Sequence, residues 1–295
     1  MSAIAAPRSP AREFAAGFAQ SRIALAGLAM LCLILVAATA APVISPQNPY
    51  DLAQLDIMDS KLPPGEKGSS GASYLLGTDD QGRDMFSAIL YGLRISLGVG
   101  VMSTVAALAI GLAIGLISAY AGGWLDALIM RIVDLQLSFP SILIALVLLA
   151  VLGQGVDKII IALITVQWAY YARTVRGNAL VERRKEYVDA AVCLAYSTPR
   201  VLFRHILPNC LPPLIVVATV QVAHAIALEA TLSFLGLGMP ITSPSLGLLI
   251  SNGFTHLLSG KYWISFFPGI ALLITIVSIN LVGDQLRDVL NPRLK

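Results

Sequence analysis

The chain has 295 residues, of which 57% are hydrophobic and only 13% are charged, and its formal net charge is +3. A soluble domain usually carries about 25% charged residues, so roughly half that load argues against a soluble protein and indicates one whose solvent is lipid. The small net charge, with no stripe of Lys and Arg interleaved with aromatic residues, argues against a nucleic-acid-binding protein.

The first apolar run, Ile23–Ala41, follows three arginines and has 19 residues. Two interpretations compete: a secretory signal peptide cleaved near Ala40, or an uncleaved first membrane span. We favour the span, because the apolar part of a signal peptide has only about 7–15 residues and because further apolar runs follow.

The next segment, Pro42–Tyr91, is rich in Pro, Gly, Ser and Asp. We expect it to lie outside the membrane with short helices but no core of its own.

Five further runs meet or approach the roughly 20 apolar residues that a helix needs to cross a bilayer core of about 30 Å. They are Ile95–Ala119, Leu135–Leu152, Ile159–Ala172, Leu211–Leu228 and Ile264–Gly283. The run Ile159–Ala172 has only 14 residues, but snorkelling of Lys158 and Arg173 lengthens it. In the third span, Phe139-Pro140 predicts a kink. The sequence thus predicts an all-α polytopic membrane protein with six transmembrane helices.

The basic residues predict how these spans are oriented. If the N-terminus is inside, fourteen of the 20 Lys and Arg residues are cytoplasmic and six are external. By the positive-inside rule, both the N- and the C-terminus are therefore expected in the cytoplasm. Seven of the fourteen lie between Arg173 and Arg204, which places the loop of residues 181–210 on the cytoplasmic side.

Within that loop, Glu182–Leu194 has the spacing of a short amphipathic helix. Its expected apolar face consists of Tyr187, Ala191 and Leu194. Lys185 is placed to pair with Asp189 one turn later.

The surface of this helix has two interpretations. Its basic residues are suited to anchoring it on anionic lipid. The small, flat Ala190-Ala191 surface beside acidic and aromatic neighbours is suited instead to a groove on another protein. Further along, Thr198 is a predicted N-cap, with Pro199 in the first turn of a second short helix.

Ionisable residues at membrane depth are functional hypotheses by default. For Asp134, an interfacial pair with Arg131 competes with a gating role. For Glu229, lining a passage competes with a structural hydrogen bond, and for His224 a packing role is favoured.

Three further residues, Gln167, Trp168 and Asn280, are candidates to line a passage. Gly111 and Gly115 form a GxxxG pair, which permits two helices to approach closely and indicates packing.

The sequence has no GxxxxGK[ST], HExxH or GxSxG motif, and its three cysteines form no CxxC or Cys/His cluster. We therefore expect a non-catalytic chain that binds no metal or cofactor itself.

Two neighbouring motifs carry a family resemblance. Glu186-Tyr187-Val188-Asp189-Ala190-Ala191, followed by His205-Ile206-Leu207-Pro208-Asn209, resembles the "EAA" loop of binding-protein-dependent ABC importer permeases. The resemblance implies that the loop is a coupling helix, which docks into a cleft on an ATP-binding subunit. The coupling residues that it implies are Glu186, Tyr187, Asp189, Ala190, Ala191, Ala195, His205, Leu207 and Pro208. Two positions depart from the motif: Asp189 replaces Glu, and Ala195 replaces the usual Gly.

Other segments are similar to the dipeptide, oligopeptide and nickel branch of this family. They include Leu76–Asp84, Tyr91–Leu97, Ala121–Trp124, Leu232–Gly238 and Leu290–Lys295. The resemblance is to the C-type permease and implies the type I ABC importer permease fold. Residues 1–91 would then hold the cytoplasmic tail, the first span and the external segment. Residues 92–295 would form a five-span core with the coupling loop 181–210.

The resemblance implies a permease subunit in the bacterial cytoplasmic (inner) membrane that imports di- or oligopeptides. A nickel or other small-solute importer is the alternative within the family. Its implied partners are a homologous second permease, two ATP-binding subunits that hold ATP and Mg, and an extracytoplasmic solute-binding protein, in addition to membrane lipid. An alternative of another class is a stand-alone secondary transporter or channel. It predicts charged relays, or broken-helix pairs in matching halves of the chain, and the sequence shows neither.

Overall fold

The computed structural model describes residues 10–290 apart from residues 70, 72 and 244. In this part of the chain every regular element is helical, and the only strand-like pairings are two isolated bridges, Lys67–Ser73 and Thr78–Asp84. The α-helices are α1 (Pro10–Phe18), α2 (Arg22–Thr39), α3 (Ala41–Ile44), α4 (Met85–Ala121), α5 (Gly123–Ser138), α6 (Ser141–Leu152), α7 (Val156–Glu182), α8 (Glu186–Cys193), α9 (Thr198–Val201), α10 (Leu207–Phe234), α11 (Leu246–Phe254) and α12 (Trp263–Leu290).

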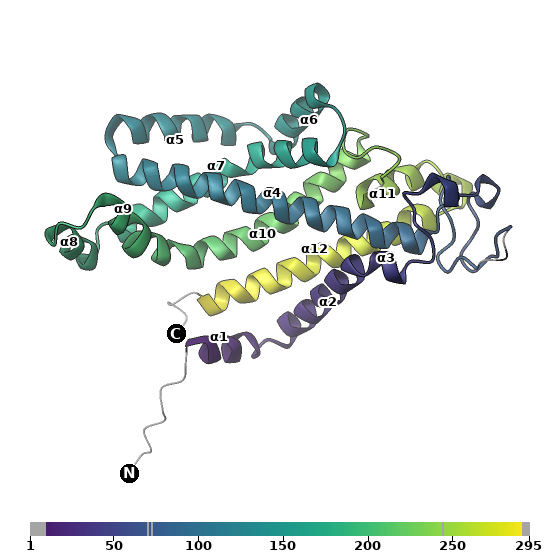
Figure 1. The fold of residues 1–295 in the computed structure, drawn as a ribbon, viewed down its shortest axis with the longest axis horizontal. Helices are drawn as coiled ribbons and strands as arrows, with labels where there is room; N and C mark the ends of the chain where they lie inside the picture. Colours follow the sequence, from purple (N-terminus) through teal and green to yellow (C-terminus); the bar gives the residue numbers. More distant parts are fainter. Residues whose placement is uncertain (1–9, 70, 72, 244, 291–295) are drawn as a thin grey trace, which may run out of the picture.

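The long helices run side by side along one axis, and the two ends of the molecule differ (Figure 1). Toward one end lie α1, α8, α9, the turn between α4 and α5, and the last turns of α12. Toward the other end lie α11 and the segment between α3 and α4, which contains the short 3₁₀ helices Leu52–Gln54 and Ile57–Asp59. This separation matches the cytoplasmic and external sets of segments expected from the basic residues.

Four helical stretches are long and apolar enough to cross a membrane: α2, α4, the continuous stretch Thr198–Phe234 that ends in α10, and α12. The pair α5 and α6 would add a fifth if it is one bent span. The predicted span Ile159–Ala172 lies within α7, which is not among them. Helix α7 packs along α4 with one side buried, on which Ile159, Leu163 and Ala172 are fully covered. Its other side is open, with Ile161 and Tyr170 47% and 49% exposed. Only the buried side is freed from the demand for an apolar surface, because protein rather than lipid covers that side.

The prediction of one kinked third span, Leu135–Leu152, is wrong as to its continuity. Helix α5 ends at Ser138, α6 begins at Ser141, and the two are bent by 89°. The cause is Pro140, which has no N–H to donate and disfavours the helical conformation at the residue before it. Phe139 accordingly has an extended backbone, with φ −92° and ψ 142°.

The α4–α7 contact confirms the predicted role of the GxxxG pair. A Cβ placed on Gly111 would lie 2.4 Å from the Cβ of Tyr171, and one on Gly115 would lie 2.6 Å from the carbonyl oxygen of Ala172. Only glycine lets the two helices come this close.

The external segment is attached to the helical core by buried polar contacts. The indole N–H of Trp263 donates to the carbonyl of Thr78 at 3.2 Å, and Arg83 donates to the carbonyl of Ile241 at 2.8 Å. Arg83 is also fully buried beside Asp79, with 3.6 Å between their charged atoms. Burial raises the pKa of Asp79 to about 6, although hydrogen bonding and charge from Arg83 act in the opposite direction.

Candidate coupling surface and passage

The loop of residues 181–210, here called the coupling segment, presents α8 at one end of the molecule (Figure 1). Val188 and Ala191 are only 2% and 3% exposed, because they pack against the chain's own core. Glu186, Ala190 and Cys193, spaced four and three residues apart, are exposed. At 3.6 residues per turn these three share one face, so α8 is docked by one stripe and open on the other.

Helix α8 differs from the predicted helix in four respects. The helix begins at Glu186 rather than Glu182, since Lys185 has an extended backbone at the N-cap position, with φ −87° and ψ 144°. Lys185 therefore pairs with Glu182, at 2.6 Å, and not with Asp189. The expected apolar face is also wrong: Leu194 is 67% exposed, while Val188, which was not expected on that face, is buried. Ala191, predicted to contact an ATPase, points into the chain, whereas Asp189 and Ala190 remain open.

Tyr187 joins the two ends of the coupling segment. Its hydroxyl donates to the carboxylate of Glu182 at 2.6 Å and lies 3.3 Å from the carbonyl oxygen of His205. Asn209 donates to both the Tyr187 hydroxyl, at 3.0 Å, and the His205 carbonyl, at 2.8 Å. Burial, and then the hydrogen bond to Glu182, raises the pKa of Tyr187 to about 12. The hydroxyl therefore keeps its proton and remains a donor at any physiological pH.

Helix α8 ends in a turn whose central residue is Ala195, at φ +54°. The N–H of Ala195 donates to the carbonyl of Val192 at 2.9 Å, and the N–H of Tyr196 donates to that of Ala191 at 3.2 Å. These two bonds define a Schellman motif, whose left-handed position usually holds glycine. The geometry that glycine would provide is thus retained with alanine.

After this turn, Thr198 does not cap α9 as predicted; Ser197 holds the N-cap position, and the Thr198 hydroxyl lies 2.7 Å from that of Tyr120. A π-helical turn, Leu202–Ile206, then leads into α10. Within it the imidazole of His205 stacks on Tyr196, with ring centroids 5.8 Å apart. The following residues, Leu207 and Pro208, form the first turn of α10, where the missing N–H of a proline is tolerated.

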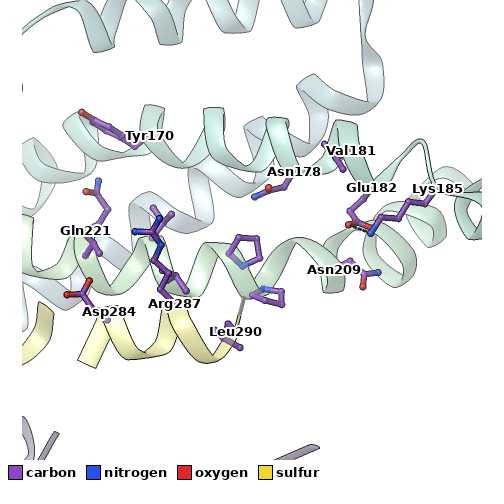
Figure 2. Close-up of a pocket in the computed structure, with 16 residues that line it drawn as sticks. Tyr170, Asn178, Val181, Glu182, Lys185, Asn209, Gln221, Asp284, Arg287 and Leu290 are labelled. Carbon is purple, nitrogen blue, oxygen red and sulfur yellow. Dashed lines mark hydrogen bonds and ion pairs between the residues drawn. The ribbon is translucent and has the colours of Figure 1, made fainter. Parts of the chain in front are cut away.

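A cavity of about 930 Å³ opens between α7, α10 and α12 on the side of the coupling segment. Figure 2 shows Tyr170 and Asn178 from α7, Gln221 from α10, and Asp284 and Arg287 from α12 around it. The ion pair of Glu182 and Lys185 lies at its edge, so the cavity adjoins the coupling segment directly.

None of the six candidate passage or gate residues lines this cavity; they are Asp134, Gln167, Trp168, His224, Glu229 and Asn280. Gln167 is fully buried and accepts a hydrogen bond from Thr104 at 3.3 Å. His224 is exposed, and Asn280 is partly buried. Asp134 pairs with Arg173 on α7, and not with Arg131 as one interpretation predicted.

The carboxylate of Glu229 is buried between helices α4 and α10. It is fully buried and accepts hydrogen bonds from Ser96 of α4 and Ser233 of α10, each at 2.8 Å. These contacts favour the structural alternative for Glu229 that the sequence left open.

The polar residues that do line the cavity were missed because they come from three helices far apart in the sequence. A signal existed for two of them: Asp284 and Arg287 are charged residues in the last turns of an apolar helix, one turn beyond Asn280. Nothing in the sequence indicates that α7 and α10 contribute to the same cavity.

Comparison with known proteins gives a consistent family assignment. Residues 111–295 match the family described as binding-protein-dependent transport system inner membrane component. Residues 9–64 match the N-terminal transmembrane domain of oligopeptide transport permease C.

Curated relatives match along most of the chain. It is 37% identical over 290 residues to the dipeptide transport system permease protein DppC of Haemophilus influenzae, covering 98% of this chain and 97% of that protein. It is 36% identical to the di/tripeptide transport system permease protein DppC of Pseudomonas aeruginosa, covering 97% of this chain and 93% of that protein. A putative peptide transport system permease protein of Brucella suis is 42% identical, over 91% of this chain and 87% of that protein.

A solved structure shares the fold. A chain of the MetNI methionine ABC transporter, in an inward-facing conformation, superimposes with a TM-score of 0.58 at 21% identity, covering 70% of this chain and 97% of that one.

Proposed function

Because this chain belongs to the family of binding-protein-dependent transport inner-membrane components, we propose that it is the permease subunit of an ATP-driven importer for di- or oligopeptides. It is a multi-pass protein of the inner membrane. Three relatives named as dipeptide, di/tripeptide or peptide permeases, each matching more than nine-tenths of the chain, support peptides as the solute.

The topology that we propose has six spans, with both termini in the cytoplasm. Helix α7 supplies the fourth span, and α5 with α6 supplies the third as one broken span. The positions of α1, α8 and the end of α12 at the same end of the molecule support this arrangement (Figure 1).

The open face of α8 is the proposed docking site for an ATP-binding subunit. It carries Glu186, Asp189 and Ala190, which are small or acidic and exposed, on a helix held by its opposite stripe. This exposed helix face is the observation that carries the coupling proposal. ATP and Mg would be held by the partner subunits; among the described residues there is no cluster of three His, Cys, Asp or Glu suited to a metal ion.

The proposed mechanism is mechanical. Closure of two ATP-binding subunits displaces α8, and α7 and α10, which are continuous with the coupling segment, change the shape of the cavity that they line. Such switching between inward- and outward-open states requires that the partners bind the two states with different affinity. The other proposed partners are a homologous second permease and an extracytoplasmic solute-binding protein.

The docking proposal is tested by Ala190→Arg. The variant is expected to insert in the membrane normally, because Ala190 is exposed, but to lose co-purification with the ATP-binding subunits and ATP-dependent uptake. Ala53→Arg, at a position in the external segment that is also exposed, is the matched control and should behave as wild type. Wild-type co-purification and uptake with Ala190→Arg would refute the proposed surface. Ala191→Arg is less informative, because burial predicts misfolding instead.

The solute is tested on the solute-binding protein that works with this permease. Thermal shift measurements with dipeptides, tripeptides, longer peptides and nickel should show stabilisation by peptides. Stabilisation by nickel alone would favour the metal importer. Uptake that continues without the ATP-binding subunits would favour the stand-alone transporter.

A further inference from the structure

The turn between α4 and α5, residues 118–126, lies beside the coupling segment and is here called the α4–α5 corner (Figure 1). The chain reverses its direction there at two consecutive glycines, Gly122 and Gly123, with φ +63° and +56°. Such values are accessible to glycine at little cost. No atom lies within 4 Å of a Cβ placed on either residue, so the glycines are required by the turn and not by crowding.

A paired set of hydrogen bonds fastens the first turn of α5 to α7. Arg176 donates through Nε and a terminal nitrogen to the two carboxylate oxygens of Asp126, both at 2.5 Å. The hydroxyl of Ser118, in the last turn of α4, donates to the same carboxylate. The side chains of Asp126 and Arg176 are 16% and 31% exposed. Bidentate Arg–carboxylate pairs fix orientation as well as distance.

Two further residues fasten the corner to both flanks of α8. On the near side, Arg183 donates to the carbonyls of Ala119 and Tyr120, each at 3.0 Å, and its guanidinium lies 5.2 Å from the centre of the Tyr120 ring. On the far side, the Tyr120 hydroxyl lies 2.7 Å from the hydroxyl of Thr198.

Apolar packing reinforces the same connection. Leu116 and Ala119 of α4 belong to one buried cluster with Val188 and Ala191 of α8 and Val201 of α9. Helix α8 and the end of α4 thus contribute to one buried cluster, which also contains Val175 and Ala179 of α7. Hydrogen bonds and an aromatic contact join the residues on either side of α8 in the chain to the corner.

We propose that the α4–α5 corner is a second transmission element, which carries the displacement of α8 directly into α4 and α5. The inference rests on the proposed function. It assigns Tyr120, Asp126, Arg176 and Arg183 as positioning residues that contact no substrate and no nucleotide. While the contacts of the corner are formed, a displacement of α8 moves α4, α5, α7 and α10 together. Without these contacts, it moves only α7 and α10, to which the chain connects α8. Energetic coupling travels through packed and hydrogen-bonded networks of this kind.

The first test measures solute imported per ATP hydrolysed by the full transporter in proteoliposomes. Tyr120→Phe, which removes only the hydroxyl, and Asp126→Asn are expected to keep ATP hydrolysis while lowering this ratio, Asp126→Asn by about fivefold to tenfold, the lower part of the usual range for linked sites. Thr174→Val is the matched control for loss of a hydroxyl, because Thr174 bonds only within its own helix. The charge exchange Asp126→Arg with Arg176→Asp restores an ion pair of opposite polarity. It should therefore raise the solute imported per ATP above the value for Asp126→Asn. An unchanged ratio in both Tyr120→Phe and Asp126→Asn overturns the proposal.

The second test replaces the contact between the hydroxyls of Tyr120 and Thr198 by a covalent link. In a chain with Cys32→Ser and Cys193→Ser, the pair Tyr120→Cys and Thr198→Cys is expected to transport poorly per ATP and to regain the ratio when a short bifunctional maleimide links the two thiols. If the corner and α9 move apart during the cycle, linking them stops uptake and overturns the proposal. Wild-type chain that shows no ATP-dependent uptake counts against the proposed function instead, so the two failures are distinguishable.

Discussion

Ala195 is an alanine in a conformation that favours glycine, at φ +54° in the turn that ends α8. A left-handed backbone costs an L-residue roughly 1–2 kcal/mol, and glycine avoids most of this cost. We predict that Ala195→Gly stabilises the turn by about 1 kcal/mol, which corresponds to about fivefold slower hydrogen exchange at the amide of Tyr196. Ala195→Val should accelerate that exchange. Faster exchange in the glycine variant would contradict the assigned conformation.

Glu229 is a residue whose role could only be resolved by its neighbours. Its two serine partners lose their acceptor in Glu229→Leu, and a buried polar group left without a partner costs about 1–3 kcal/mol. Thermal unfolding in detergent should therefore show a clear loss of stability for Glu229→Leu and only a small change for Glu229→Gln, which keeps polar atoms for both hydroxyls. Equal stability of the two variants would show that the hydrogen bonds to Ser96 and Ser233 are unimportant.

At the scale of elements, the α4–α7 contact is the tightest test of the fold. Gly111→Ala would place a methyl group 2.6 Å from the carbonyl oxygen of Trp168 as well as against Tyr171, and backbone cannot move aside as a side chain can. We predict a loss of about 1–3 kcal/mol, the usual cost of overpacking, read out as a lower unfolding temperature. Gly98→Ala on the same helix has no atom within 4 Å of the new Cβ and should be neutral or slightly stabilising. A neutral Gly111→Ala would refute the close crossing.

How well an element was predicted from the sequence depends on whether its cause is local. The apolar runs located α2, α4, α10 and α12, and the GxxxG pair located a helix crossing, since both are patterns within one segment. The rotation of α8 was mispredicted because it depends on where the helix starts, just after Lys185, and on which of its residues enter the buried cluster shared with α4, α7 and α10. Likewise, Pro140 predicted a distortion of the third span. The 89° angle between α5 and α6 could not be predicted, because it depends on what the two helices pack against.

At the scale of the whole molecule, the native Cys193 reports which side of the membrane the coupling segment occupies. It is exposed, whereas Cys210 is buried. With Cys32→Ser, a membrane-impermeant maleimide should label Cys193 in inverted vesicles and not in spheroplasts. Bound ATP-binding subunits should protect it, because Cys193 shares the open face with Ala190. Leu258→Cys, at a fully exposed position toward the external segment, should show the reverse pattern. Labelling of Cys193 from outside would overturn the topology.

The packing of α7 against α4 bears on how the chain is inserted into the bilayer during synthesis. Its 14 uncharged residues between Lys158 and Arg173 make it a poor candidate for leaving the insertion machinery alone, since charged residues are costly at bilayer depth. Its main packing partner, α4, is synthesised earlier and is strongly apolar. We therefore expect α7 to wait at the machinery until it can enter lipid against α4, so that its helical contacts are made as part of biogenesis and not after it.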